Sequence, residues 1–236
     1  MSRASAIATW KEQGTAVLFD FGGTLDADGT PWKERFFRLY LNEGVAVAPE
    51  QFDAAFYAAD DALVGTVPPA LSFRDTVRAL ADSVREALGV SDRAVAGRIA
   101  NRFLADALEQ LQERRPLLQA LGERYRLGVV SNFYGNLATV CEDAGIRRFF
   151  RVVVDSGETG YVKPDPRIFH QAVEGLAIDS SGAVFVGDSL PRDMAGARAV
   201  GMPHIWLAGP NARGETPCCP GDGVIRSLVE LAELLL

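Results

Sequence analysis

Cysteine, lysine and long hydrophobic runs are all scarce in this sequence of 236 residues. Its three cysteines, two of them adjacent at Cys218 and Cys219 in a Gly/Pro-rich loop, make no disulfide framework, and that pair is too far from any histidine for a metal site. No apolar stretch approaches the ~20 residues that span a bilayer. The N-terminus also lacks the apolar core of a signal peptide. We therefore expect a globular protein of a reducing compartment, the cytoplasm, without membrane contact.

Positive charge is in short supply as well. The 24 Lys and Arg residues are outnumbered by 31 Asp and Glu residues, which gives a formal net charge of −7 and a pI near 5.0. This balance argues against non-specific binding to nucleic acid. It does not argue against a small anionic substrate, because the local field at a binding site is set by the residues of that site.

Short apolar runs alternate with helical segments over most of the chain. Such alternation is typical of a parallel sheet that is covered on both faces. The expected strands are Thr15–Asp20, Arg126–Ser131, Arg151–Asp155, Ala183–Asp188, Pro203–Leu207 and Gly223–Ile225. The expected connecting helices are Asn136–Ala144, Asp165–Leu176, Arg192–Val200 and Ser227–Leu235. The sequence thus predicts an α/β fold with a doubly wound, Rossmann-like parallel sheet.

One long segment, residues 26–115, contains no convincing strand. Apolar residues recur in it at three-to-four spacing, as they do on the buried side of a helix. The expected helices are Trp32–Glu43, Pro49–Leu63, Phe73–Leu88 and Asp92–Glu113. We therefore predict a core of residues 15–25 and 116–236, an all-helical domain of residues 26–115 inserted after the first strand, and a flexible N-terminal lead-in of residues 1–14.

Chemically useful side chains stand at or near the ends of the expected strands. The carboxyl ends of parallel strands meet at one edge of a sheet, where open α/β sheets bind their ligands. Taken singly, each of these residues is explained as a turn, a helix cap or a solvated charge, but together they predict one site. They are Asp20 with the turn Phe21–Leu25 behind it, Ser131 with Asn132, Lys163 in GYVKPDP, and Asp188 with Asp193 in GDSLPRD.

In order and spacing, these elements resemble the four motifs of the haloacid dehalogenase-like (HAD) hydrolase superfamily. LFDFGGTL resembles the first motif, usually DxDxT; VVSN resembles the second, Lys163 the third and GDSLPRD the fourth. The resemblance covers essentially the whole chain and implies a HAD core with a C1-type cap at the inserted helical domain. It has one departure, because Gly22 stands where the family has the Asp that acts as general acid/base.

The resemblance implies a phosphoryl-transfer site with a role for each motif. Asp20 would be the nucleophile that forms an aspartyl-phosphate, with Ser131 and Lys163 as the other catalytic residues. A Mg²⁺ ion would offset the repulsion between carboxylate and phosphate. Its expected ligands are Asp20, the backbone carbonyl of Gly22, Asp188 and Asp193. The expected substrate-binding residues are Gly22, Gly23, Thr24, Ser131, Asn132 and Lys163.

The missing acid/base is the main open point about function. A positioned general acid/base is worth ~10²–10⁴ in rate. Another group could replace it, a substrate with a good leaving group could make it unnecessary, or turnover could be slow. The candidates for replacement are Asp26 and Asp28 just after the turn, and Lys33, Glu34, Asp60 and Asp61 in the helical domain.

The leading prediction is a Mg²⁺-dependent phosphatase that acts on a small phosphorylated metabolite. A haloacid dehalogenase, a phosphonate C–P hydrolase with Lys33 as its Schiff-base lysine, and a weakly catalytic phosphate-binding or regulatory protein are the alternatives. Two acids beside a nucleophilic Asp repel one another without a cation, which argues against the metal-free dehalogenase. Candidate pocket or contact residues are Trp32, Arg35, Arg38, Phe52, Phe56, Tyr57, Tyr134 and Asn136. Neither the natural substrate nor the oligomeric state follows from the sequence.

Overall fold

Six parallel strands form one sheet in the order β3-β2-β1-β4-β5-β6. The structure, a computed structural model, describes residues 4–210, 212 and 223–236, so the predicted loop cysteines Cys218 and Cys219 lie outside the described residues. The predicted Rossmann-like α/β fold is confirmed. The strands are β1 (Ala16–Phe19), β2 (Arg126–Ser131), β3 (Phe150–Asp155), β4 (Ala183–Gly187), β5 (His204–Leu207) and β6 (Gly223–Ile225).

Strand β1 lies at the centre of this sheet and is buried along its whole length. Its side chains alternate between two hydrophobic clusters, with Val17 and Phe19 in one and Ala16 and Leu18 in the other. From β1 the chain first builds the sheet toward β2 and β3 and later toward β4, β5 and β6. The order therefore reverses between β1 and β4, and the crevice beyond their carboxyl ends is the usual ligand site of such sheets.

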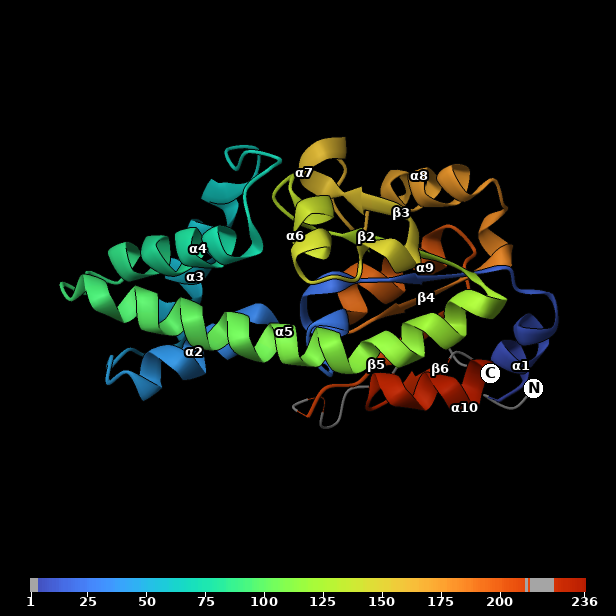
Figure 1. Ribbon diagram of the computed structural model, residues 1–236, viewed down its shortest axis with the longest axis horizontal. Helices are drawn as coiled ribbons and strands as arrows, with labels where there is room; N and C mark the ends of the chain where they lie inside the picture. Colours follow the sequence, from blue (N-terminus) through green and yellow to red (C-terminus); the bar gives the residue numbers. More distant parts are fainter. Residues whose placement is uncertain (1–3, 211, 213–222) are drawn as a thin grey trace.

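Helices cover both faces of the sheet (Figure 1). On one face α8 (Pro166–Leu176) packs against β2 and β3, and α9 (Ala195–Ala199) joins the same cluster. On the other face lie α1 (Ala4–Gln13), α6 (Leu137–Asp143), α10 (Leu231–Leu235) and the C-terminal part of α5 (Arg93–Arg124). Trp10 of α1 is buried and stacks on Tyr125, with ring centroids 5.4 Å apart, so this helix is packed onto the core. The remaining short elements are η1 (Phe21–Leu25), η2 (Arg147–Phe149), α7 (Ser156–Thr159), η3 (Ser180–Gly182), η4 (Leu190–Met194) and η5 (Leu228–Glu230).

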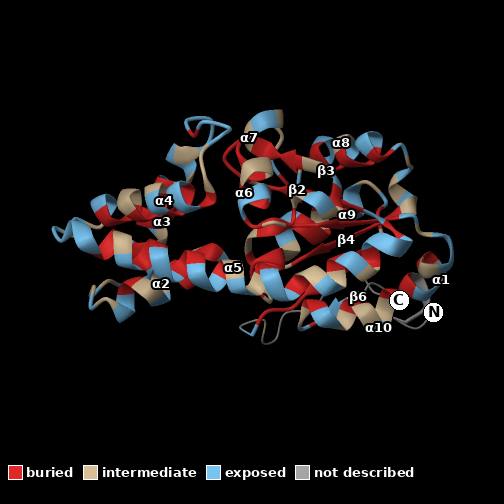
Figure 2. Ribbon diagram, in the orientation of Figure 1, coloured by how far each residue is buried: buried red, intermediate tan, exposed pale blue. Residues whose placement is uncertain are grey.

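A second group of helices lies to one side of the sheet, at the left of Figure 1. It consists of α2 (Trp32–Asn42), α3 (Pro49–Leu63), α4 (Phe73–Ala87) and the N-terminal part of α5. The buried residues of these helices face one another, as the red stripes in Figure 2 show. The three-to-four spacing of apolar residues in this segment is therefore explained by helix-on-helix packing.

The long helix α5 connects this helical group with the sheet. The sequence predicted a helix over Asp92–Glu113, but α5 runs on to Arg124 through Pro116, so the expected end is wrong. A proline inside a helix removes one hydrogen bond and crowds the preceding turn. Leu118 and Leu121 beyond it are almost completely buried in the core, and this burial offsets the penalty. Over the described part of the chain, no helix has both the length and the apolar character needed to cross a membrane.

Candidate active site

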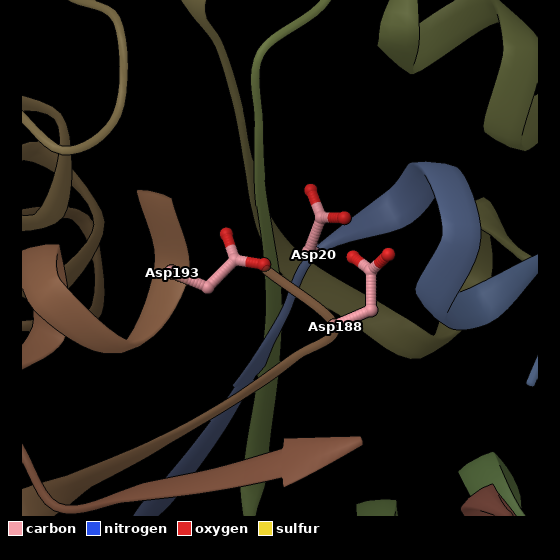
Figure 3. A group of neighbouring side chains, drawn as sticks. All are labelled: Asp20, Asp188 and Asp193. Carbon is pink, nitrogen blue, oxygen red and sulfur yellow. The ribbon is translucent and has the colours of Figure 1, made fainter. Parts of the chain in front are cut away.

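Three carboxylates meet at the carboxyl ends of β1 and β4. Asp20 directly follows β1, Asp188 directly follows β4, and Asp193 lies in η4, the turn after β4. Each contributes an oxygen to a group in which all the atoms lie within 4.8 Å of one another (Figure 3). The turn is closed by its own hydrogen bonds, since the Ser189 amide donates to Asp193 Oδ2 at 3.0 Å. Neighbouring strands and one tight turn thus bring together residues 168 or more positions apart from Asp20 in the sequence.

Lys163 is the cation of this cluster. Its buried ammonium donates to Asp20 Oδ1 at 2.6 Å and to Asp193 Oδ1 at 2.7 Å. The side chain of Asn132 holds the Lys163 backbone at both ends: it accepts from the Lys163 amide at 2.7 Å and donates to its carbonyl at 3.2 Å. The Ser131 hydroxyl donates to Asp20 Oδ1 at 2.8 Å. Asp20 therefore has one oxygen fixed by two donors.

The charges of this cluster do not balance. Burial and then the neighbouring Asp20 and Asp193 carboxylates raise the pKa of Asp188 well above its ordinary value. Burial also raises the pKa of Asp193, although its contact with Lys163 opposes the shift. For Lys163, burial lowers the pKa but the two carboxylates raise it by more, so the ammonium stays charged. Three acids share one lysine, and a further cation would relieve the remaining repulsion.

The donor atoms fit a hard divalent cation. Mg²⁺ prefers oxygen ligands, and this end of the sheet offers carboxylate oxygens from three residues in one small group. Asp188 makes no ion pair with any described residue; its contact is with the Thr24 hydroxyl, 3.3 Å from Oδ1. Thr24 also lies 3.4 Å from Asp20 Oδ2, fully buried behind the two carboxylates. These features fit the predicted Mg²⁺ site.

The turn after Asp20 requires glycine at Gly23 but not at Gly22. Gly23 has φ +88°, and a Cβ there would lie 2.6 Å from Asp188 Oδ2, so a side chain would be strained and would displace the carboxylate. Gly22 has φ −76°, which any residue adopts. A Cβ on Gly22 would lie 3.3 Å from Trp32 Nε1. The Trp32 indole therefore stands against the position from which the family's acid side chain would project.

Two candidates for the missing acid/base have other tasks. Asp26 is fully buried; its Oδ1 accepts from the Gly23 amide, and its Oδ2 accepts from Trp32 Nε1 and from Arg35, each at 2.7 Å. Asp28 accepts from the Ser227 hydroxyl and the Leu228 amide, at 2.9 and 3.0 Å. Neither residue lines the cavity beside Asp20. Asp26 instead fixes the turn and the start of the helical group.

A cavity of about 400 Å³ opens from Asp20 toward the helical group. The core lines it with predicted site residues, among them Gly22, Ser131, Asn132 and Lys163, whereas Gly23 and Thr24 lie outside its lining. The helical group contributes an aromatic and polar wall. The lining residues of that wall are Trp32, Lys33, Phe56, Tyr57 and Asp60, and Phe133, Tyr134 and Arg192 face it from core loops.

Several expectations about pocket residues are corrected by this arrangement. Arg35 is buried and binds Asp26 and Asp106, at 2.7 and 2.8 Å, so it does not face a substrate. Asn136 donates to Leu71 O at 2.9 Å and to the Thr76 hydroxyl at 2.6 Å, which ties the core to α4. Arg38, Glu34, Phe52 and Asp61 likewise do not line the cavity.

Sequence reasoning did not find two features of the cavity. Arg192 is not among the predicted site residues, although it lines the cavity. Its position between Asp188 and Asp193 in GDSLPRD is a sequence feature that could have predicted this. The hydrogen bond from the Tyr134 hydroxyl to Asp60 Oδ1 joins residues 74 positions apart, and the sequence carries no signal for it.

Known proteins share both the sequence pattern and the fold. The family model described as haloacid dehalogenase-like hydrolase matches residues 15–201. Haloacid dehalogenase-like hydrolase domain-containing protein 3 of Bos taurus is 45% identical over 85 residues, 36% of this chain and 34% of the bovine protein. A phosphoserine phosphatase of Thermus thermophilus is 31% identical over 139 residues, 55% of this chain and 53% of that protein. A HAD phosphatase structure from Thermococcus onnurineus has the same fold, with a TM-score of 0.58 at 24% identity, over 94% of this chain and 97% of that one. The chain thus matches between a third and about half the length of these two curated relatives.

Proposed function

Because this chain belongs to the haloacid dehalogenase-like hydrolase family, we propose that it is a Mg²⁺-dependent phosphatase acting on a small phosphorylated metabolite. The observation that carries this proposal is the group of three carboxylates with Lys163 at one end of a cavity of about 400 Å³. A relative that matches about half of this chain is a phosphoserine phosphatase. A phosphorylated metabolite similar in size to phosphoserine would place its phosphoryl group beside the three carboxylates and Lys163, at this end of the cavity.

Asp20 is the proposed nucleophile. Ser131 and Lys163 both donate to its Oδ1, at 2.8 and 2.6 Å, whereas Oδ2 has a longer contact of 3.4 Å with the Thr24 hydroxyl. Oδ2 is therefore the oxygen that we propose attacks phosphorus. Lys163 also keeps a positive charge beside the non-bridging oxygens of the phosphoryl group. Asn132 sets the position of Lys163 through the lysine backbone. A Mg²⁺ ion held by Asp20, Asp188, Asp193 and the Gly22 carbonyl would neutralise phosphoryl charge.

The alternatives have weaker support. A dehalogenase that works without a metal would leave three neighbouring carboxylates to repel one another around one lysine. A C–P hydrolase needs a neutral lysine amine for its Schiff base. Lys33 instead binds Asp53 at 2.8 Å, and its pKa is raised: burial lowers it, but the Asp53 contact raises it by more. The amine of Lys33 is thus kept protonated and unreactive.

The helical group is the proposed cap. We assign it residues 26–115 and assign the catalytic core residues 15–25 and 116–236. Trp32, Lys33, Phe56, Tyr57 and Asp60 of the cap line the cavity, which supports a role of these helices in contacting the part of the substrate beyond the phosphate. Helix α5 crosses the boundary between the two parts without a break.

Phosphate release tests this proposal. Wild-type protein and Asp20→Asn are assayed with aryl, acyl, sugar and nucleotide phosphates and with phosphoserine, in Mg²⁺ and in EDTA. Release that requires Mg²⁺ and is lost in Asp20→Asn is expected, and the preferred substrate identifies the leaving group. Asp179→Asn, a change of an exposed aspartate away from the site, is the matched control. Equal release by Asp20→Asn and wild type would refute the nucleophile assignment.

A further inference from the structure

Asp60 and Tyr134 form a polar contact between cap and core inside the active-site cavity. Asp60 lies on α3 of the cap, and Tyr134 lies in the loop that follows β2. The Tyr134 hydroxyl donates to Asp60 Oδ1. Both side chains line the same cavity as Asp20. The carboxyl group of Asp60 is therefore held by a hydrogen bond in the lining of the cavity that Asp20 also lines.

Among the described residues, four acids line this cavity: Asp20, Asp60, Asp188 and Asp193. Three of them form the carboxylate group at the end of the sheet and are assigned to nucleophile and metal. Asp60 is the remaining one, and it approaches from the opposite, cap side. The other candidates to replace the acid missing at Gly22 lie outside the cavity, except Lys33. The ammonium group of Lys33 forms an ion pair with Asp53.

We infer that Asp60, positioned by Tyr134, is the general acid/base that replaces the carboxyl group missing at Gly22. This inference rests on the proposed phosphatase function. It assigns catalysis to a cap residue, so the acid/base is present at the reaction centre only while the cap is closed over the core. The substrates it implies are unactivated alkyl phosphates, such as phosphorylated alcohols and sugars, whose leaving oxygen needs a proton.

The proton balance of both steps is complete with these residues. In the first step Asp20 Oδ2 bonds to phosphorus, the bond from phosphorus to the alcohol oxygen breaks, and that oxygen takes the proton of Asp60. Asp60 is then a carboxylate that accepts the Tyr134 hydrogen bond. In the second step water enters where the alcohol left, gives a proton to Asp60 and bonds to phosphorus. The bond from phosphorus to Asp20 breaks, which releases inorganic phosphate and restores both carboxyl groups.

The surroundings of Asp60 favour this task. Burial raises the pKa of Asp60, and the nearby Asp61 adds to the shift, while the Tyr134 hydrogen bond and the Arg192 charge oppose it. Lys33 is a further cation in the lining of the cavity. A carboxyl group with a raised pKa is better able to hold a proton near neutral pH. Because the acid form acts first, alkyl phosphate cleavage should decline as pH rises through the pKa of Asp60.

Two substrates with different leaving groups test the assignment. Asp60→Asn is compared with wild type on an aryl phosphate with a good leaving group, p-nitrophenyl phosphate, and on an alkyl phosphate, glycerol phosphate. Asparagine has the same shape and still accepts from Tyr134 but has no proton to give. Glu50→Gln, an exposed change on the same helix, is the matched control. Tyr134→Phe tests positioning through the pH profile of kcat/KM.

The expected result is a loss of ~10²–10⁴ in kcat/KM for glycerol phosphate, because kcat/KM reports the first step, in which the leaving oxygen takes the proton of Asp60. The second step is the same for both substrates, so kcat is not used for the comparison. The loss in kcat/KM for p-nitrophenyl phosphate should be roughly tenfold or less, because that leaving group needs little protonation in the first step. The activity retained on p-nitrophenyl phosphate also shows that the variant is folded. Tyr134→Phe should move the alkaline limb of the glycerol phosphate profile upward, since removing the hydrogen bond to the carboxylate raises the pKa of Asp60.

Three outcomes would overturn the inference. Equal losses in kcat/KM on both substrates would make Asp60 a structural contact of the cap, and no loss in kcat/KM on either substrate would show that Asp60 has no catalytic role. An unchanged pH profile in Tyr134→Phe would refute the positioning by Tyr134. The phosphatase proposal fails separately: in that case wild-type protein releases no phosphate from either substrate in Mg²⁺, whatever the residue at position 60.

Discussion

Asp188→Asn should make the metal-free protein more stable while abolishing its response to Mg²⁺. Asp188 lies with Asp20 and Asp193 in a group whose oxygens are within 4.8 Å of one another, and its raised pKa has burial and those two carboxylates as its causes. Asparagine keeps the shape and can still accept from Thr24, but it carries no charge. The substitution therefore removes the repulsion of Asp188 by Asp20 and Asp193, and it also removes the attraction of Asp188 to Lys163.

The size of the effect follows from the geometry. Two unit charges 4.8 Å apart repel by about 3.5 kcal/mol at an effective dielectric constant near 20. Loss of the attraction to Lys163 cancels part of this gain. We expect a net increase of about 2 kcal/mol in the free energy of unfolding, which is roughly 4–8 °C in Tm for a protein of this size.

The assay is thermal and urea unfolding in EDTA and in Mg²⁺, at several pH values. Because the folded-state pKa of Asp188 is raised, wild-type protein without metal should lose stability as pH rises through that pKa, and Asp188→Asn should lose less. In Mg²⁺ wild type should gain stability by mass action and the variant should not. The reasoning would be refuted if Asp188→Asn were less stable than wild type in EDTA, or if Mg²⁺ stabilised it as much as it stabilises wild type. The control is Asp179→Asn, which removes an exposed charge away from the site.

Three further predictions concern the same site and the core. Lys163→Met should lower the free energy of unfolding by about 3–5 kcal/mol in urea titrations, because it leaves Asp20 and Asp193 as unpaired buried charges; a loss within error would contradict the pairing. Gly23→Ala should weaken Mg²⁺ binding in calorimetry, since its Cβ would lie 2.6 Å from Asp188 Oδ2. Cys141 should resist iodoacetamide in the native protein, because burial raises the pKa of its thiol to about 12; labelling of the Cys141 peptide before unfolding would contradict this.

Much of the core could be predicted because its signals are local. Each buried parallel strand is a short apolar run, and a strand's own residues decide that pattern. The same holds for the polar residues that end those strands: Asp20, Ser131 and Asp188 lie at one edge because parallel strands end at one edge. The presence of helices in residues 26–115 also followed from spacing. The end of α5 did not, because the continuation through Pro116 depends on burial of Leu118 and Leu121 in a core assembled from distant segments.

The candidates for the missing acid/base show where sequence reasoning stops. Asp26, Asp28 and Asp60 are the same residue type; the first two closely follow the Gly22 turn, and Asp60 lies further along the chain, in α3. The sequence has no way to rank them, because a carboxylate's role depends on the donors that reach it. In the tertiary structure Asp26 accepts hydrogen bonds from Trp32 and Arg35, whereas Asp60 lines the cavity.

The sequence by itself determined the sheet, the family and the residues that gather at Asp20, because these depend on periodicity and on residues next to strand ends. Tertiary structure alone decided what surrounds them. It decided that Lys163 bridges two acids, that Trp32 lies against Gly22 and that Tyr134, in the loop after β2, meets Asp60 of α3. Contacts of this kind join side chains far apart in the chain, and their geometry exists only once the helices have packed against one another and against the sheet.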